Sequence, residues 1–121
     1  IVVNRTLRSR NESINYRFLK GHKVAFVGHL DEYEAFIAEN ELPDLLYCGT
    51  RNILQLAIAI RSCKFFIGNQ SLCFALAEAM KVPRILETCS YLPNVIPSGE
   101  KAYDFYFQST LEYYFNFLND E

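Results

Sequence analysis

The sequence has few glycines, five in 121 residues, and none of them falls in the polar segment 4–11 that follows the first apolar residues. No G-x-G-x-x-G fingerprint and no P-loop pattern occurs anywhere in the chain. These absences argue against a classical NAD- or FAD-binding domain and against a P-loop nucleotide-binding protein. Any recognition of phosphate must therefore come from side chains and helix N-termini.

Long hydrophobic runs are also missing, since no apolar stretch approaches the roughly 20 residues of a membrane-spanning helix. No signal peptide is visible. We therefore expect no transmembrane segment. Half of the residues are nevertheless apolar and 15% are aromatic, a composition that favours a packed domain over a disordered chain.

The four cysteines, Cys48, Cys63, Cys73 and Cys89, match neither a zinc-binding nor a CxxC spacing. We predict that they are free thiols in a reducing, cytoplasmic location, with Cys63 and Cys73 as small core residues. We expect no metal site and no bound cofactor.

Charge is unevenly distributed along the chain. Residues 1–24 contain six basic residues and one acidic residue, although the whole chain has a net charge of −2. This asymmetry indicates an anionic ligand or partner near the N-terminal segment, or alternatively a solvated basic surface. A basic tract with interleaved aromatic residues is lacking, so nucleic acid is not an expected partner.

Apolar runs and capping residues alternate in a regular order. Predicted strands lie at 1–3, 23–27, 44–48, 64–67, 84–87 and 102–107. Predicted helices lie at 13–20, from a cap at Asp31 to about Asn40, from a cap at Thr50 or Asn52 to Ser62, and at 71–80 and 111–118. The third of these is apolar on most sides, so we expect it to be deeply packed.

Short apolar strands that alternate with helices are typical of βαβ units. The sequence predicts an α/β fold, a Rossmann-like open parallel sheet of five or six strands with helices on both faces. Residues 1–121 would form a single domain. The chain begins with a strand and no Met, which we interpret as an edge strand and as a sign that the sequence is a fragment of a longer protein.

The turn Gly68-Asn69-Gln70-Ser71 is the main candidate site. It joins the predicted strand 64–67 to a helix, and ligands of open α/β sheets bind where strands end and helices begin. Gly68 permits a close backbone approach, Asn69 and Gln70 carry amides, and Ser71 can cap the helix. Alternatively, these residues only end a strand and start a helix.

Charged residues near the same edge are further candidates. Arg5 and Arg8 follow the first strand, and an arginine suits a diphosphate. Glu78, two helical turns after Ser71, could accept two ribose hydroxyls, or could instead pair with Lys81 or Arg84. Glu87 ends the next strand at the ligand-binding edge.

Aromatic residues are concentrated near the end of the chain, where eight occur between positions 103 and 117. One terminal helix does not easily bury so many rings. We expect some of them to face a further domain or a partner chain.

The segment from Phe66 to Ile85, with its Gly68-Asn69-Gln70-Ser71 turn, its Glu78-Ala79-Met80 and its Val82-Pro83, resembles the C-terminal, donor-binding domain of GT-B glycosyltransferases, especially the heptosyltransferase type. The similarity extends over about residues 45–90. The chain departs from that family at Gln70, where an Asp is usual, and at Leu72, where a Gly is usual.

This resemblance implies a nucleotide-diphosphate-sugar donor as the ligand, with Glu78 as the ribose contact and Arg5 as a diphosphate contact. It also implies that the chain is part of a glycosyltransferase, since GT-B enzymes need a second, N-terminal Rossmann-like domain for the acceptor. A non-catalytic Rossmann-like module for protein interactions is the alternative.

Overall fold

The computed structural model describes all residues, 1–121, and contains one six-stranded, entirely parallel sheet. The strand order is β3-β2-β1-β4-β5-β6. The strands are β1 (Val2–Asn4), β2 (Ala25–Phe26), β3 (Leu46–Tyr47), β4 (Phe66–Asn69), β5 (Arg84–Glu87) and β6 (Ala102–Phe105). This order is that of the doubly wound Rossmann fold, which confirms the predicted fold class.

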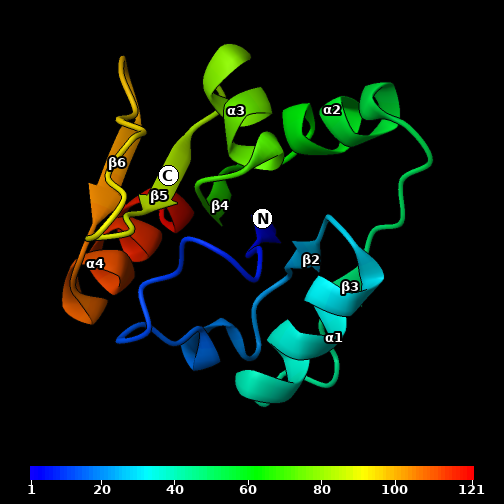
Figure 1. Ribbon diagram of the computed structural model, residues 1–121. Helices are drawn as coiled ribbons and strands as arrows, with labels where there is room; N and C mark the ends of the chain where they lie inside the picture. The colour runs from blue at the N-terminus through cyan, green and yellow to red at the C-terminus, as the bar shows by residue number, and fades with distance from the viewer.

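Four helices cover the two faces of the sheet, as Figure 1 shows, with α2 and α3 above it and α1 and α4 below it in that view. The helices are α1 (Leu30–Glu39), α2 (Ile53–Arg61), α3 (Leu72–Ala79) and α4 (Gln108–Asn119). Both faces of β1, β4 and β5 are therefore buried, as a parallel sheet requires, whereas the edge strand β3 is exposed.

Alternate strand residues supply two separate hydrophobic cores. Val3, Phe26, Ile67 and Ile85 pack toward α1 and α4. Val2, Phe66 and Leu86 pack toward α2 and α3 on the opposite face. Because side chains alternate along a strand, both cores follow directly from the uninterrupted apolar runs.

The first strand is central, because β1 pairs with β2 on one side and with β4 on the other. The prediction of an edge strand was therefore wrong. The chain crosses from β3 to β4 through α2, so the strand order reverses between β1 and β4. The carboxyl ends of these two strands define the topological switch point of the sheet.

The predicted helix at 13–20 is only a single 3₁₀ turn, η1 (Arg17–Leu19). Side chains from distant elements hold this segment in an irregular path. The Asn11 N–H donates to Glu87, and the Tyr16 N–H donates to Asn40 Oδ1 at 2.8 Å. Tertiary hydrogen bonds thus replace the helical ones.

Two helices differ from expectation in their detail. Helix α1 begins after His29 rather than at a cap on Asp31, because the His29 N–H donates to Glu32 Oε1 at 3.0 Å. Helix α2 has the expected Asn52 cap on the Gln55 N–H. However, α2 is not deeply packed, since Ile53, Leu54 and Ile58 are 59%, 67% and 56% exposed.

All four cysteines are free thiols, and Cys73 is buried as predicted, whereas Cys63 is only partly buried. No helix in the chain combines the length and the apolar character that crossing a bilayer needs.

Candidate functional site

A cleft of about 1100 Å³ opens at the carboxyl edge of the sheet, beside the switch point. Every segment that leaves the carboxyl end of β1 to β5 contributes to it. Its lining residues include Asn4, Thr6, Leu7, Arg8, Ser9, Gly28, His29, Glu32, Thr50, Gln70, Ser71, Leu72, Cys73, Tyr91 and Leu92. This is the place where open α/β sheets bind their ligands.

The floor of the cleft is held rigid by a short polar chain. The Ser71 hydroxyl donates to Asn4 Oδ1 at 3.1 Å, and Asn4 Nδ2 donates to the Val27 carbonyl at 2.8 Å. Ser71 also caps α3 by accepting from the Phe74 N–H, as predicted from the sequence. Strands β1, β2 and β4 are therefore linked where the cleft begins.

Gly68 allows β1 and β4 to approach each other at this point. A Cβ built on Gly68 would lie 2.7 Å from the Phe66 ring and 3.1 Å from the Asn4 carbonyl oxygen. Gly68 thus serves the packing beneath the cleft, and it does not line the cleft itself.

Donors without protein partners gather in the cleft. The side chains of Arg8 and Gln70 form no hydrogen bond or ion pair within the protein, although both line the cleft. The backbone N–H groups of Leu7, Arg8 and Ser9 also lack an acceptor in the protein. In addition, the first N–H groups of α3 have no acceptor within the helix. Together these groups favour an anion.

Glu32 is the single acidic residue of the cleft lining, and it was not among the site residues predicted from the sequence. It is buried, its Oε1 accepts the His29 N–H, and its Oε2 has no protein partner. It lies just after β2, where Rossmann folds place the carboxylate that accepts ribose hydroxyls. The Glu three residues after the helix cap was the sequence signal that could have indicated it.

Asn69 is fully buried at the end of β4 and faces the loop that follows β1. Its Oδ1 accepts the Thr6 N–H at 3.0 Å, and its Nδ2 donates to Thr6 Oγ1 at 2.9 Å and to the Arg8 carbonyl at 2.8 Å. These contacts place Asn69 behind the cleft wall rather than on its surface.

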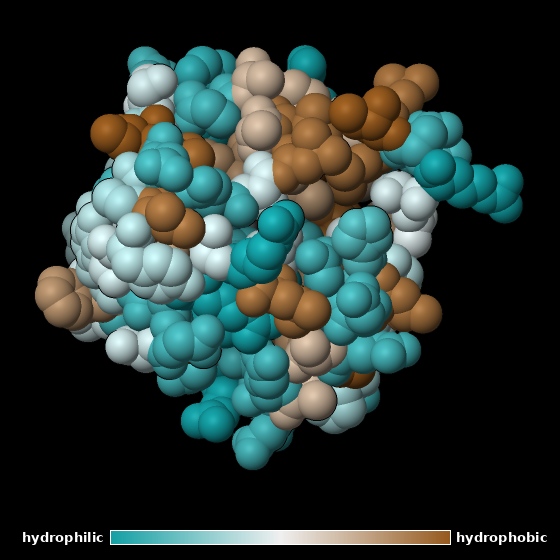
Figure 2. Space-filling model, viewed as in Figure 1, coloured by the Kyte–Doolittle hydropathy of each residue, from teal (hydrophilic) through white to brown (hydrophobic).

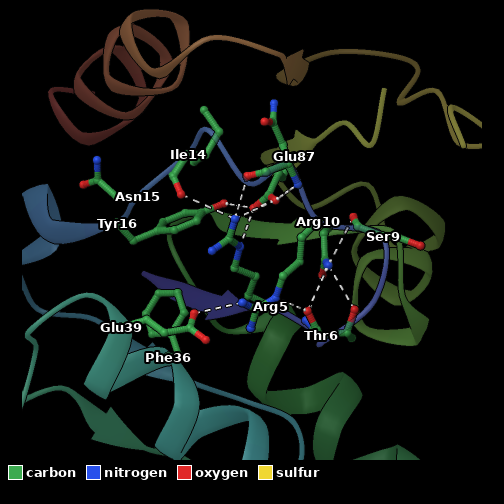
Figure 3. A network of polar contacts seen from close by, with 12 residues as sticks. Arg5, Thr6, Ser9, Arg10, Ile14, Asn15, Tyr16, Phe36, Glu39 and Glu87 are labelled. Carbon is green, nitrogen blue, oxygen red and sulfur yellow. Dashed lines mark hydrogen bonds and ion pairs between the residues drawn. The ribbon is translucent and has the colours of Figure 1, made fainter. Parts of the chain in front are cut away.

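Arg5 does not line the cleft. Figure 3 shows its side chain directed toward Tyr16 and Glu87. Its guanidinium donates to Glu87 through Nε at 2.9 Å and through a second nitrogen at 3.0 Å. Tyr16 donates to the same carboxylate at 2.7 Å. The predicted candidates Arg5 and Glu87 are thus brought together, but as a buried ion pair with no side toward a ligand.

Burial and the charge of Glu87 together set the direction in which the pKa values of Arg5 and Tyr16 are shifted. Burial opposes the charge of Arg5, but the hydrogen bond and the charge of Glu87 raise the Arg5 pKa above its ordinary value. Burial and the neighbouring Glu87 charge raise the pKa of Tyr16 well above its ordinary value, which keeps its hydroxyl protonated as a donor.

Two basic residues of the N-terminal segment are neutralised inside the molecule, whereas Arg8, Arg17, Lys20 and Lys23 are exposed. Arg5 pairs with Glu87, and the buried Arg10 pairs with Glu39 at 2.8 Å. Arg8 is the basic residue that remains in the cleft.

Glu78 lies outside the cleft, in a shallow groove along α3 that shares Gln70 and Ser71 with it. Its carboxylate pairs with Arg84 and Lys81, each at 2.7 Å, and also accepts from Ser98. The hydrogen bond from Arg84 is the main cause that lowers the pKa of Glu78 to about 2. Glu78 thus pairs with Lys81 and Arg84, which was the predicted alternative to a ribose contact.

The residues that line the cleft favour neither thiolate chemistry nor metal binding. Burial raises the pKa of the Cys73 thiol to about 12, so this cleft residue is no thiolate nucleophile at neutral pH. No three His, Cys, Asp or Glu side chains gather in a way that could hold a metal ion.

The fold and the cleft together define an α/β protein of Rossmann topology with a polar site at its switch point. No protein-family model matches the chain, and comparisons with curated proteins and with solved structures give no match either.

Proposed function

We propose that this chain is the donor-binding domain of a GT-B glycosyltransferase and binds a nucleotide-diphosphate sugar in the cleft at the switch point. The observation that carries the proposal is the set of unpartnered donors on both sides of this cleft, Arg8 with the Leu7–Ser9 N–H groups on one and Gln70 with the α3 N-terminus on the other. Helix N-terminal N–H groups and an arginine are donors that bind phosphate oxygens, as a diphosphate would offer.

Glu32 supports a nucleotide rather than a simple diphosphate. Its free Oε2 can accept ribose hydroxyls, while the diphosphate lies toward Arg8 and α3. Glu78 and Arg5 are not needed in this arrangement, because protein partners already occupy both side chains.

The reaction would be the transfer of the sugar to an acceptor held by a second domain. The donors of this chain would stabilise the departing nucleoside diphosphate, on which negative charge develops as the glycosidic bond breaks. The acceptor and the catalytic base would lie outside this domain, and the sugar is not specified by it.

Calorimetric titration of the chain with UDP, GDP and ADP tests the proposal. We expect one of them to bind, and Arg8→Ala to weaken that binding by roughly tenfold, because it removes the only unpaired cation of the cleft. Arg17→Ala is the matched control, since Arg17 is exposed and lies outside the cleft. Absence of binding by all three nucleotides would contradict the proposal.

A protein-interaction module is the second candidate, favoured by the exposed apolar side of α2. Figure 2 shows apolar side chains gathered over α2 and α3, where Ile53, Leu54, Ile58 and Leu72 are all more than half exposed. Patches of this kind mark interaction surfaces. For this candidate, Leu54→Gln would weaken association with the partner protein, whereas Arg8→Ala would leave it unchanged.

A further inference from the structure

The loop between β1 and η1 has no regular structure, yet four of its residues, Thr6, Leu7, Arg8 and Ser9, form one wall of the cleft. Ser9 has a positive φ of 56°, a conformation that non-glycine residues rarely adopt. Something outside the loop must hold this wall in place.

Asn69 is the side chain that does so. It contacts the loop at Thr6 N, Thr6 Oγ1 and the Arg8 carbonyl, with longer contacts to the Thr6 and Ser9 carbonyls at 3.3 and 3.5 Å. The Thr6 hydroxyl adds a bond of its own to the Arg8 carbonyl at 2.9 Å. The Arg8 carbonyl thus turns inward, toward Asn69.

These bonds direct the Asn69 amide at the loop and not at a ligand. Its Nδ2 donates to Thr6 Oγ1 and to the Arg8 carbonyl, and its Oδ1 accepts the Thr6 N–H. Asn69 is also completely buried. Its effect on a ligand must therefore pass through the loop.

We propose that Asn69 is a positioning residue, which fixes the Thr6–Ser9 wall so that Arg8 and its neighbouring N–H groups face the diphosphate. This inference rests on the proposed function for its ligand. Asn69 would thus act without touching the ligand. Through Asn69, strand β4 would affect how strongly the loop after β1 binds the diphosphate.

The first test measures the affinity of a nucleoside diphosphate and of the matching nucleoside for the chain. Asn69→Ala should weaken diphosphate binding by roughly tenfold and leave nucleoside binding unchanged, because only the Arg8 wall moves. In an Arg8→Ala background the same change should have a smaller effect than in the unmodified chain, since Asn69 acts in part through the Arg8 side chain. Equal losses for both ligands, or fully additive effects, would overturn the inference.

Milder variants cover the case in which Asn69→Ala does not fold. Thr6→Val removes the hydroxyl that links Asn69 to the Arg8 carbonyl, and should reproduce the loss of diphosphate affinity in part. Thr6→Ser keeps that hydroxyl and should restore it. Tyr16→Phe removes a buried hydrogen bond at the other end of the loop and should leave the affinity unchanged.

Amide hydrogen exchange separates this inference from the proposed function. If no nucleoside diphosphate binds the unmodified chain, the proposed function fails. Exchange of the Thr6 amide still tests the positioning, because its acceptor is Asn69 Oδ1. Asn69→Ala should speed exchange of the Thr6 amide and Tyr16→Phe should not, while equal exchange in both variants and in the unmodified chain would overturn the inference.

Discussion

At the scale of single residues, Glu87 organises the interior next to the site. It is completely buried and accepts hydrogen bonds from Arg5, from Tyr16 and from the Asn11 backbone. Figure 3 shows these groups converging on one carboxylate. Breaking a buried ion pair is destabilising because the remaining charge stays in the interior.

Glu87→Gln should therefore lower the free energy of unfolding by about 3 kcal/mol, since it leaves Arg5 buried without a counter-charge. Urea denaturation measures this change. Glu121→Gln is the control, because the Glu121–Lys101 pair is exposed on both sides and should matter much less than the buried pair. Similar losses in the two variants would contradict this account of Glu87.

Glu78 makes a pH-dependent contribution to stability. Its pKa is about 2 in the folded protein against an ordinary value of 4.5. A carboxylate with a lowered folded-state pKa stabilises the protein above its unfolded-state pKa, and this stabilisation disappears as the pH falls from about 4.5 toward about 2.

Glu78→Gln should thus be less stable than the unmodified chain at pH 6, and the difference should shrink as the pH approaches 2. Thermal melts across this pH range measure the effect. A difference that stays constant with pH would show that Glu78 acts through packing and not through its charge.

At the scale of elements, the strands and the turn were predictable because local pattern determines them. The run Arg84–Glu87 was predicted with the bounds that β5 has, and the Ser71 and Asn52 caps were predicted from residue type alone. Local sequence specifies such features because their partners lie within one turn of the chain.

The contacts of Arg5 and Asn69 were not predictable in this way. Arg5 meets a carboxylate 82 positions along the chain, and Asn69 meets a loop about 60 positions before it. Position at the carboxyl edge indicated that these residues lie near the site. It could not indicate which way each side chain turns, because that depends on the register between β1, β4 and β5.

Gly68→Ala tests the close approach of β4 to β1. The added Cβ would lie 2.7 Å from the Phe66 ring, closer than real Cβ contacts, and 3.1 Å from the Asn4 carbonyl oxygen, which is tighter than most of them. We expect a loss of about 1–3 kcal/mol in the free energy of unfolding, measured by urea denaturation. Gly49→Ala is the control, because its Cβ would make only an ordinary contact of 3.6 Å with the Tyr47 ring.

At the scale of the whole molecule, apolar surface is left uncovered on the outer side of α2, in the loop after β5 and near the chain end. In the loop Tyr91 and Ile96 are 69% and 79% exposed, and near the chain end Phe107 and Tyr113 are 72% and 65% exposed. The exposure near the chain end agrees with the expectation that the terminal helix cannot bury all eight rings, since Phe105 and Phe115 occupy the core positions.

Ligand binding should stabilise the whole domain if the proposed function holds. A nucleoside diphosphate at one hundred times its dissociation constant adds about 2.7 kcal/mol to the free energy of unfolding. A rise in the thermal midpoint that Arg8→Ala removes and Arg17→Ala retains would support binding in the cleft. A rise that both variants retain would place the ligand elsewhere.

The central position of β1 has a consequence for how the chain is made. β1 is synthesised before the other five strands of the sheet, yet one of its two neighbours is β4, which follows more than sixty residues later. Until β4 is synthesised, the apolar side chains of Val2 and Val3 cannot be fully buried. We therefore expect a nascent chain that ends before β4 to remain unfolded and to depend on chaperones, and the sheet to assemble late and nearly at once.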